Sequence, residues 1–305
     1  MLRSALQPSL SPSSALLRGL APTRLPDSPE QLLAAAPDLE ALPVVAQKVL
    51  AIVRDERATV EGIASLLGTD QALAAAVLRA ANSGGSMPSR RIASLREAVA
   101  RIGLRALSEV LVRACAGPML DRGLPPYALP RRVAWRHAAT VSIAARRLAA
   151  LTSVATPDEA SVAGLLHDVG KMVLTAVVPE AAARAVSLAR GQRIPVWQAE
   201  ETVLGFHHGA VGAALLRSWG LPEIVVDAVA CHHQPELASS RLAVIISLAD
   251  AAAHTVGAVG GGGACPQPVW DAAAAADLGA PADQIQAFLD TLECVEEGEL
   301  LKVSE

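Results

Sequence analysis

All seven histidines of this 305-residue chain lie between residues 137 and 254, and one of them is followed directly by an aspartate. The pair, His167-Asp168, offers an imidazole and a carboxylate that can reach a common metal ion, and the carboxylate can also bridge two ions. Lys171 lies four residues after His167 and therefore shares its helix face. A His-Asp dipeptide alone is a weak signal of a site, so its meaning depends on the polar residues that the fold brings beside it.

Other segments place histidine or aspartate on the apolar face of a predicted helix. His137 and His208 each share a face with aliphatic residues, so both are expected to point into the core. Asp250 lies on an apolar helix, where an unpaired buried carboxylate would cost several kcal/mol, so it should be paired or metal-bound. The pair His232-His233 ends a further apolar helix.

Each of these residues alone has a simpler explanation. A single inward histidine is usually a satisfied core residue, and Asp250 could form a salt bridge with an arginine. Together, however, several inward helices that each offer His or Asp are what a polynuclear metal site in a helical core requires. Imidazole and carboxylate donors suit Fe, Mn, Zn, Ni or Mg and exclude a thiolate site.

The elements that must position these groups are predicted to be helices. The hydrophobic fraction is 52%, much of it alanine, whereas aromatic residues make up only 2%, so the side chains that fill a sheet core are scarce. No strand-like alternation persists, and the chain is predicted to be all-α. Short helices are expected in the first half, with Thr59, Asp70 and Ser94 as N-caps. Longer helices are expected at about 131–150, 158–176, 179–190, 195–219, 222–233 and 240–255, and a short one near 282–292.

These helices are predicted to form one domain over residues 26–255. A smaller N-terminal helical lobe is expected at 26–120, and the lobe that carries the metal site at 131–255. The segment 117–130 contains Gly-Pro and Pro-Pro pairs, reads as a loop and is the expected hinge between the lobes.

The two ends are expected to lie outside this domain. Residues 1–25 are predicted to be a disordered tail rather than a targeting peptide, because a continuous apolar segment and a convincing cleavage site are lacking. Residues 256–305 are predicted to contain a glycine-rich loop, the short helix and an acidic tail.

Bulk properties argue against several classes of function. The formal net charge of −4 gives no electrostatic footprint for nucleic acid, and no apolar run reaches the roughly 20 uncharged residues that span a bilayer. The absence of any CxxC spacing favours reduced thiols. We therefore expect a cytoplasmic protein without nucleic-acid or membrane partners. The four scattered cysteines are Cys115, Cys231, Cys265 and Cys294.

In the order of its polar residues the chain resembles the HD superfamily of metal-dependent phosphohydrolases, which carries His, then His-Asp, then further His, then Asp. The resemblance implies a divalent transition metal cofactor, with two ions of Fe, Mn, Zn or Ni. It also implies that Lys171 approaches a phosphate, and that Asp168 and Lys171 are the catalytic residues if the protein is an enzyme. The implied metal ligands are His137, His167, Asp168, His208, His232, His233 and Asp250.

Within that superfamily the chain resembles the HDOD group of bacterial signalling proteins over roughly residues 40–255. At Phe206-His207-His208 this group commonly has Asp before the ligand-type histidine, so His208 is the ligand candidate and His207 is expected to be an exposed variant. The motifs that carry the resemblance, in chain order, are Leu42-Pro43, Asp70–Leu73, Leu78–Ser83, Ser94–Ala98, Ile102–Arg105, Glu201–His208, Val211–Ala213, Trp219–Pro222 and His232-His233.

The resemblance leaves two functions open. HDOD proteins are generally regulatory modules that act through partner contacts, and because no receiver or cyclic-dinucleotide signalling domain accompanies this one, its signalling partners would act in trans. The alternative is a phosphohydrolase that uses a binuclear site on a nucleotide or other phosphodiester, with Asp168 as the bridging carboxylate.

Several departures favour the regulatory interpretation. Gln234-Pro235-Glu236 follows the paired histidines where the related HD-GYP phosphodiesterases have Gly-Tyr-Pro. Val133 replaces a glutamate that often precedes the first histidine by one turn, which argues against a third ion. The single tyrosine, Tyr127, leaves nucleotide recognition unexplained. His254, four residues after Asp250, is expected to be either an orienting partner of that carboxylate or a surface residue.

Overall fold

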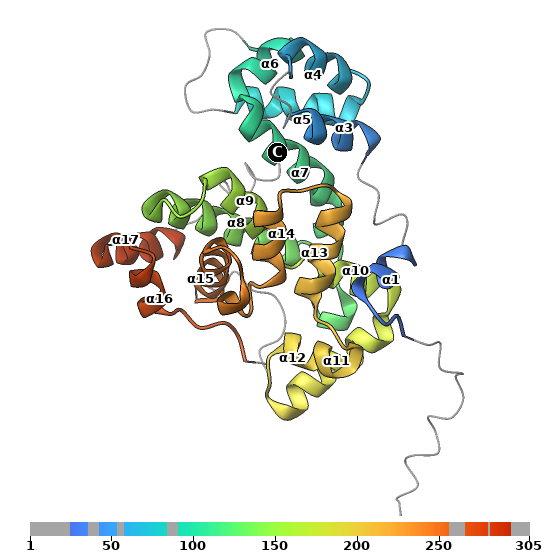
Figure 1. The fold of residues 1–305 in the computed structure, drawn as a ribbon, viewed down its shortest axis with the longest axis vertical. Helices are drawn as coiled ribbons and strands as arrows, with labels where there is room; N and C mark the ends of the chain where they lie inside the picture. Colours follow the sequence, from blue (N-terminus) through green and yellow to red (C-terminus); the bar gives the residue numbers. More distant parts are fainter. Residues whose placement is uncertain are drawn as a thin grey trace, which may run out of the picture.

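The computed structural model describes residues 25–35, 43–53, 58–83, 91–255, 266–279 and 281–293. This part of the chain is helical and contains no β-strand, which confirms the all-α prediction (Figure 1). The helices of the first half are α1 (Pro29–Ala34), α3 (Val44–Ile52), α4 (Val60–Leu67), α5 (Gln71–Asn82), α6 (Leu95–Ile102), α7 (Leu104–Leu120) and the 3₁₀ helix η2 (Pro125–Tyr127). Those of the second half are α8 (Val133–Thr152), α9 (Pro157–Leu166), α10 (Val169–Val177), α11 (Pro179–Gln192), α12 (Val196–Leu204), α13 (His208–Ser218), α14 (Glu223–Ala230), the 3₁₀ helix η3 (Pro235–Leu237), α15 (Leu242–Thr255), α16 (Ala272–Asp277) and α17 (Ala282–Glu293).

Helices α3 to α6 form a small lobe at one end of the molecule, and α7 joins it to the larger lobe (Figure 1). Two of the predicted N-caps are confirmed. The side chain of Thr59 accepts a hydrogen bond from the amide of Gly62, and that of Asp70 accepts one from the amide of Leu73. Each bond satisfies an amide that the first turn of a helix leaves without a partner. Ser94 precedes α6 as predicted, although its side chain makes no capping hydrogen bond.

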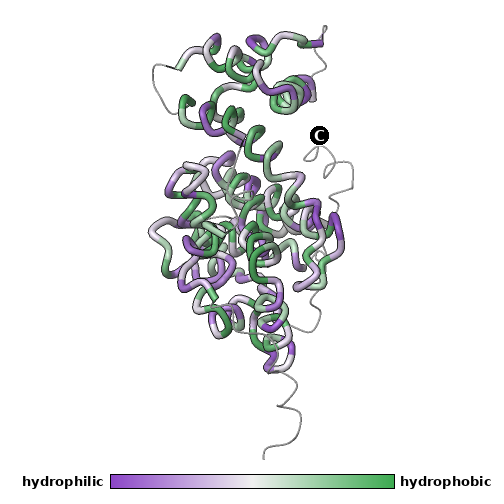
Figure 2. Tube along the Cα trace, turned by 90° about the vertical axis from the view of Figure 1, so that its right-hand side faces the viewer, coloured by the Kyte–Doolittle hydropathy of each residue, from purple (hydrophilic) through white to green (hydrophobic). Residues whose placement is uncertain are grey.

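In the larger lobe α8 packs against α9 and α15, and α10 crosses α13. Hydrophobic and hydrophilic stretches alternate along the helices (Figure 2), as expected of amphipathic helices around a shared core. Small residues permit close crossings. A Cβ built on Gly164 of α9 would lie 2.9 Å from the carbonyl oxygen of Val141, and one on Gly170 of α10 only 1.9 Å from that of His208.

Two predicted long helices are broken, and both breaks lie at the histidine motifs. The predicted helix 158–176 is wrong as a single element, because Asp168 adopts φ −100° and ψ 5° and separates α9 from α10. The predicted helix 195–219 is interrupted by Gly205, whose φ of 85° suits glycine and ends α12. Because of these breaks, the side chains of His167, Asp168 and His208 need not point where one continuous helix would direct them.

The loop predicted over residues 117–130 begins later than predicted. Helix α7 continues through Pro118 to Leu120, so part of the segment 117–130 is helical. A proline late in a helix removes only one backbone hydrogen bond, which the flanking turns tolerate here. The predicted helix near 282–292 is confirmed as α17, whereas α16 was not anticipated.

The outer segments pack on the larger lobe where they are described. Helix α1 contacts α13 and α10, although the predicted lobe division groups it with residues 26–120, and α17 contacts α8 and α15. The predicted disordered tail before residue 25, most of the glycine-rich loop, the acidic tail after residue 293, and with them Cys265 and Cys294, lie outside the described residues.

One described stretch, Pro157–Val177, has the length and hydropathy to cross a membrane. It consists of α9 and α10, and 72% of its most apolar window is buried inside the protein. Burial of this kind is typical of core helices, so the stretch is weak evidence for a membrane span.

Candidate metal centre

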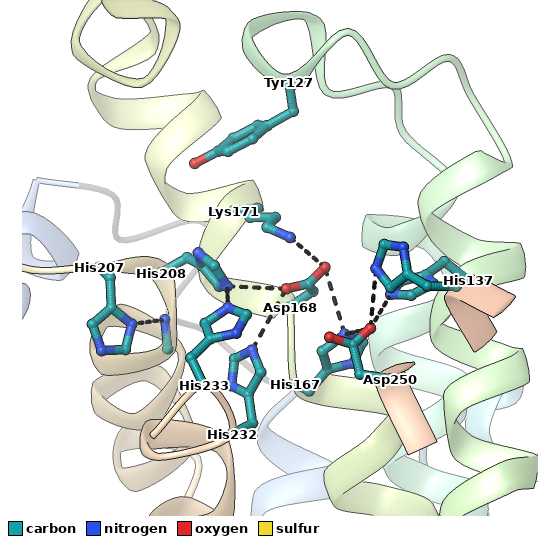
Figure 3. A network of polar contacts seen from close by, with 12 residues as sticks. Tyr127, His137, His167, Asp168, Lys171, His207, His208, His232, His233 and Asp250 are labelled. Atoms are coloured by element: carbon teal, nitrogen blue, oxygen red, sulfur yellow. Dashed lines mark hydrogen bonds and ion pairs between the residues drawn. The ribbon is translucent and has the colours of Figure 1, made fainter. Parts of the chain in front are cut away.

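Asp168 lies between two groups of histidines and turns one carboxylate oxygen toward each (Figure 3). Its Oδ1 is 3.1 Å from Nε2 of His208 and 4.0 Å from Nε2 of His232. Its Oδ2 is 3.5 Å from Nε2 of His167 and accepts a 2.6 Å hydrogen bond from Nζ of Lys171. A carboxylate in this position can contact two cations at once.

Asp250 closes one side of the cluster from α15. Its Oδ1 is 3.1 Å from Nε2 of His137 on α8 and 3.8 Å from Nε2 of His167. On the opposite side, His233 places Nε2 at 2.9 Å from Nε2 of His208. The structure thus brings all seven predicted ligands together from α8, the α9–α10 junction, the start of α13, the turn after α14 and α15.

Backbone carbonyls orient two of the imidazole rings. Nδ1 of His167 donates to the carbonyl oxygen of Gly164 and Nδ1 of His232 to that of Val229, each at 2.8 Å. A carbonyl can only accept, so the proton of each neutral ring lies on Nδ1 and the lone pair of Nε2 points at Asp168. Ligating histidines in metalloproteins are held in this way.

A buried carboxylate orients the third ring. Glu200 on α12 is 0% exposed, and its Oε2 accepts both the backbone amide and the Nδ1 proton of His208, at 2.8 and 2.6 Å. Its Oε1 accepts the hydroxyl of Tyr127 at 2.7 Å. Burial raises the pKa of Glu200, but His208 outweighs this and holds it below its usual value, whereas burial and the Glu200 charge raise the pKa of Tyr127.

Sequence reasoning missed Glu200, and it assigned no site role to Tyr127. The signal for Glu200 was present, since it lies four residues after Val196 and four before Leu204, on the side of α12 that packs inward. An inward glutamate eight residues before a candidate ligand is a natural partner for that ligand's second ring nitrogen.

Several buried polar atoms of the cluster have no hydrogen-bond partner among the described residues. They include Nε2 of His167, Nε2 of His232, Oδ1 of Asp168 and Oδ1 of Asp250. Buried polar groups are rarely left unsatisfied, because each would cost about 1–3 kcal/mol. These nitrogen and oxygen atoms all present lone pairs, and one divalent cation can accept lone pairs from several of them at once. The set of atoms therefore fits the metal that the sequence predicts.

The donors form compact groups of the right size. The ligand atoms of His137, His167 and Asp168 lie within 4.8 Å of one another, as do those of His208, His232 and His233. Nitrogen ligands about 2.1 Å from one ion are spaced at roughly 3 Å in octahedral and roughly 3.4 Å in tetrahedral coordination, so the 2.9 Å between His208 and His233 is close to the octahedral spacing. One group thus lies on each side of Asp168.

The charge states of most of these groups also suit a metal site, whereas for His208 burial is outweighed by the charge of Glu200, which raises the pKa of that ring. Burial raises the pKa of Asp168, but Lys171 and the nearby histidines outweigh it and hold the pKa well below the usual value. Burial and the neighbouring rings lower the pKa of His232 and His233 well below the usual value, so both stay neutral. A neutral imidazole is the form that binds a metal.

His207 is not the exposed residue that the sequence suggested. It is 8% exposed, and its Nδ1 accepts the amide of Gly209 at 3.0 Å, which caps α13. Its ring meets that of Trp197 edge to face at a centroid distance of 5.9 Å. Burial lowers the pKa of His207 to about 4, in keeping with a neutral ring that accepts a hydrogen bond.

The cluster opens into a cavity of about 250 Å³. Lys171, Asp168 and the ligand rings form its polar floor, and Tyr127 lies above Lys171, with Nζ 6.0 Å from the ring centroid (Figure 3). Trp197, Met172 and leucines of the α7–α8 connection form an apolar wall. The site therefore offers a small ligand a cationic group beside the ligand cluster.

These features define a helical protein with an HD-type histidine and aspartate centre. Residues 39–235 match the sequence profile of the HDOD domain, and the chain belongs to the HDOD family. The crystal structure of an HDOD domain protein from Geobacter sulfurreducens superimposes with a TM-score of 0.67 at 26% identity, over 90% of this chain and 97% of that one.

Two curated relatives are longer proteins. An uncharacterized protein of Treponema pallidum is 28% identical over 215 residues, which is 69% of this chain and 40% of that one. Ribonuclease Y of Thermus thermophilus is 36% identical over 89 residues, 29% of this chain and 11% of the enzyme. The chain therefore matches less than half the length of either relative.

Proposed function

We propose that the protein is a cytoplasmic signal-transduction module of the HDOD family, built around a divalent metal centre, that acts through contacts with signalling proteins in trans. The observation that carries the proposal is the set of buried, unpartnered Nε2 and carboxylate atoms around Asp168. Family membership supports the signalling role, and the imidazole-rich donor set supports Fe, Mn, Zn or Ni.

In this proposal the metal ties together elements that are distant in sequence. His137 would hold it from α8, His167 and Asp168 from the α9–α10 junction, and Asp250 from α15. His208 and the His232-His233 pair would hold a second ion from α13 and the turn after α14. Partner contacts on any of these helices would then be coupled to the occupancy of the centre.

Metal analysis tests the proposal directly. Protein purified without chelator or affinity metal is expected to contain at least about one equivalent of a transition metal, by mass spectrometry of the elements. Removal by a chelator should lower the melting temperature by several degrees, since a ligand that binds only the folded state stabilises it. Metal-free protein whose melting temperature does not respond to added Zn²⁺, Mn²⁺, Ni²⁺ or Fe²⁺ would contradict it.

A second candidate, a metal-dependent phosphohydrolase, is favoured by Lys171. Its ammonium lies on the cavity floor 2.6 Å from Asp168 Oδ2, where it can bind a phosphate oxygen of a nucleotide or other phosphodiester. Divalent ions at the centre would supply a nucleophile from water at neutral pH. Asp168 would hold both ions, and Lys171 would stabilise charge on the phosphoryl group. The similarity to part of ribonuclease Y supports this candidate.

A Lys171→Met variant separates the two candidates. If the protein is a phosphohydrolase, the Mn²⁺-loaded wild type hydrolyses bis(p-nitrophenyl) phosphate, and the variant should lose about 100-fold in kcat, because a charge-stabilising donor is removed while the ligands remain. Lys48→Met, at an exposed position on α3, is the matched control. Fully loaded wild-type protein that leaves this diester and a panel of nucleotide diesters intact would argue for the signalling module alone.

A further inference from the structure

A second cavity lies at the junction of the two lobes, away from the metal centre. Its volume is about 1040 Å³, and among the described residues none lines both this cavity and the one at Asp168. Its walls come from α5 of the small lobe, from α7, which joins the lobes, and from α8 of the larger lobe (Figure 1). We call this cavity the interlobe groove. A molecule bound in it would contact both lobes at once.

Small aliphatic side chains form two rows along the groove, and the residues of each row are four apart on one helix face. The rows are Ala72, Ala76 and Ala80 on α5, and Ala106, Val110 and Ala114 on α7. Helix axes approach to 8–10 Å depending on the side chains between them, so rows of alanine favour a close third helix. A helix 10 Å across fills about 120 Å³ per residue, and the groove therefore has room for about nine residues.

The acidic groups of the groove are already held by groups of the same chain. Glu109 of α7 is 7% exposed and pairs with Arg113 and with Arg146, the latter at 2.7 Å. Asp70 caps the start of α5 by accepting two backbone amides. Asp121 pairs at 2.8 Å with an exposed arginine of the α7–α8 connection. These carboxylates therefore leave little negative charge to repel an acidic ligand.

Arginines line both walls of the groove. Among the described residues four arginines line it against three acids, with Arg79 on α5 and with Arg132 and Arg146 on the side of α8. Arg132 is exposed, and its side chain has no hydrogen-bond or ion-pair partner among the described residues. Its φ is 68°, in the left-handed region that favours glycine. Strain of this kind is concentrated at binding sites, and a carboxylate from outside the chain would give Arg132 a partner.

Two sequence motifs that the metal centre does not use contribute to the groove. Asp70–Leu73 and Leu78–Ser83 carry part of the family resemblance, and together they supply Asp70, Ala72, Leu73, Arg79, Ala80 and Ser83 to its lining. Neither motif lines the cavity at the metal centre. The groove thus gives these motifs a place in the molecule that the metal chemistry does not.

We propose that the interlobe groove binds an acidic amphipathic helix of a signalling partner. The aliphatic face of the helix packs on the two rows of small residues, through side chains at i, i+3, i+4 and i+7. Carboxylates along its edges pair with Arg79, Arg132 and Arg146. The inference rests on the proposed action through partner contacts in trans, and it adds the surface and the chemistry of the partner.

Helix α8 links the groove to the metal centre. Trp135 lines the groove, whereas His137, two residues later and about 200° further round the helix, reaches Asp250 at 3.1 Å. A helix bound in the groove therefore packs against the element that carries one of the predicted metal ligands.

A labelled model peptide tests this inference on the full chain. The peptide has about 16 residues, because shorter helices are marginal in water, with Ala and Leu at i, i+3, i+4 and i+7 and Glu elsewhere. A second peptide carries Lys in place of every Glu. Fluorescence anisotropy is expected to show micromolar binding of the Glu peptide and at least about tenfold weaker binding of the Lys peptide. Hydrogen exchange should slow in α5 and α7 when the Glu peptide is bound.

Two variants place the binding in the groove. Arg132→Gly removes the guanidinium and relieves the strained φ, so it should fold at least as well as the wild type and bind the Glu peptide about fivefold more weakly. Ala80→Trp fills the groove from α5 and should abolish binding. The matched controls are Arg193→Gly, at an exposed arginine with φ 56°, and Ala183→Trp, at an exposed position on α11, and both should bind like the wild type.

Each outcome decides the inference. Binding of the Glu peptide that both groove variants weaken and both controls keep supports it, and if Ala80→Trp does not fold, Arg132→Gly and the exchange data decide alone. Absence of binding, equal binding of both peptides, or wild-type binding by the groove variants overturns it. So does a wild-type dimer with α5 and α7 protected, because a second copy would then fill the groove. None of these results changes the metal content, so the metal centre is tested separately by elemental analysis.

Discussion

Replacing Asp168 with asparagine is expected to remove most of the bound metal, with a loss of affinity of about 100-fold or more at the positions on both of its sides. The reason is geometric: Oδ1 faces His208 and His232 whereas Oδ2 faces His167, so one carboxylate serves two groups of donors. An amide keeps the shape but loses the charge, and its NH₂ group cannot ligate. Elemental analysis and Co²⁺ titration of the variant measure both effects.

Asp283→Asn is the matched control for this variant. Asp283 is exposed on α17, and the same change of charge there should leave metal content unaltered. Circular dichroism should show that Asp168→Asn retains its helices, because α9 and α10 are anchored by buried apolar side chains on either side of the break. If Asp168→Asn kept the metal content of the wild type, Asp168 would not be the shared ligand.

Sequence periodicity could predict that the ligands converge. His137, His208 and Asp250 each lie among apolar residues of a helix, so burial of those faces brings the side chains into one core. The prediction did not depend on knowing the crossing angles, because a single core between a few helices leaves little room for the polar groups to be far apart.

Periodicity could not predict the breaks at the site. The runs 158–176 and 195–219 each look continuous, since the residues at the breaks are compatible with helix except for Gly205. What opens the first run is the tertiary environment, in which Asp168 adopts non-helical ψ and places its oxygens between two groups of histidines. A sequence pattern that reports only local helix propensity cannot predict a break that the tertiary structure of a functional site imposes.

The partners of the ligands were also beyond sequence reasoning. Glu200 is separated from Tyr127 by 73 residues, and nothing local links the two, yet they form one buried chain of hydrogen bonds to His208. His207 was misjudged for a related reason. Its exposure was expected because the family commonly has Asp at this position, whereas the start of α13 needs an acceptor for the amide of Gly209 and the ring of His207 supplies it.

The second large effect is expected at Gly170, where α10 crosses α13. A Cβ at this position would lie 1.9 Å from the carbonyl oxygen and 2.8 Å from the carbonyl carbon of His208, and 2.8 Å from the amide nitrogen of Gly212. These are backbone atoms of a helix, which cannot turn aside as a flexible side chain does. Gly170→Ala should therefore reduce the free energy of unfolding by about 3 kcal/mol, the upper end of overpacking effects.

Equilibrium urea denaturation in the presence of chelator measures this loss without any contribution from bound metal. Gly191→Ala is the matched control: no atom lies within 4 Å of the added Cβ, and alanine should stabilise α11 by about 0.5 kcal/mol. The same crossing sets the distance from Asp168 and Lys171, at the start of α10, to His208, at the start of α13. Any helix separation that relieves the clash must also lengthen the 3.1 Å contact between Asp168 and His208, so Gly170→Ala should lose metal affinity along with stability. A variant as stable as the wild type would show that α10 and α13 do not pack this closely, and the geometry derived for the centre would fail with it.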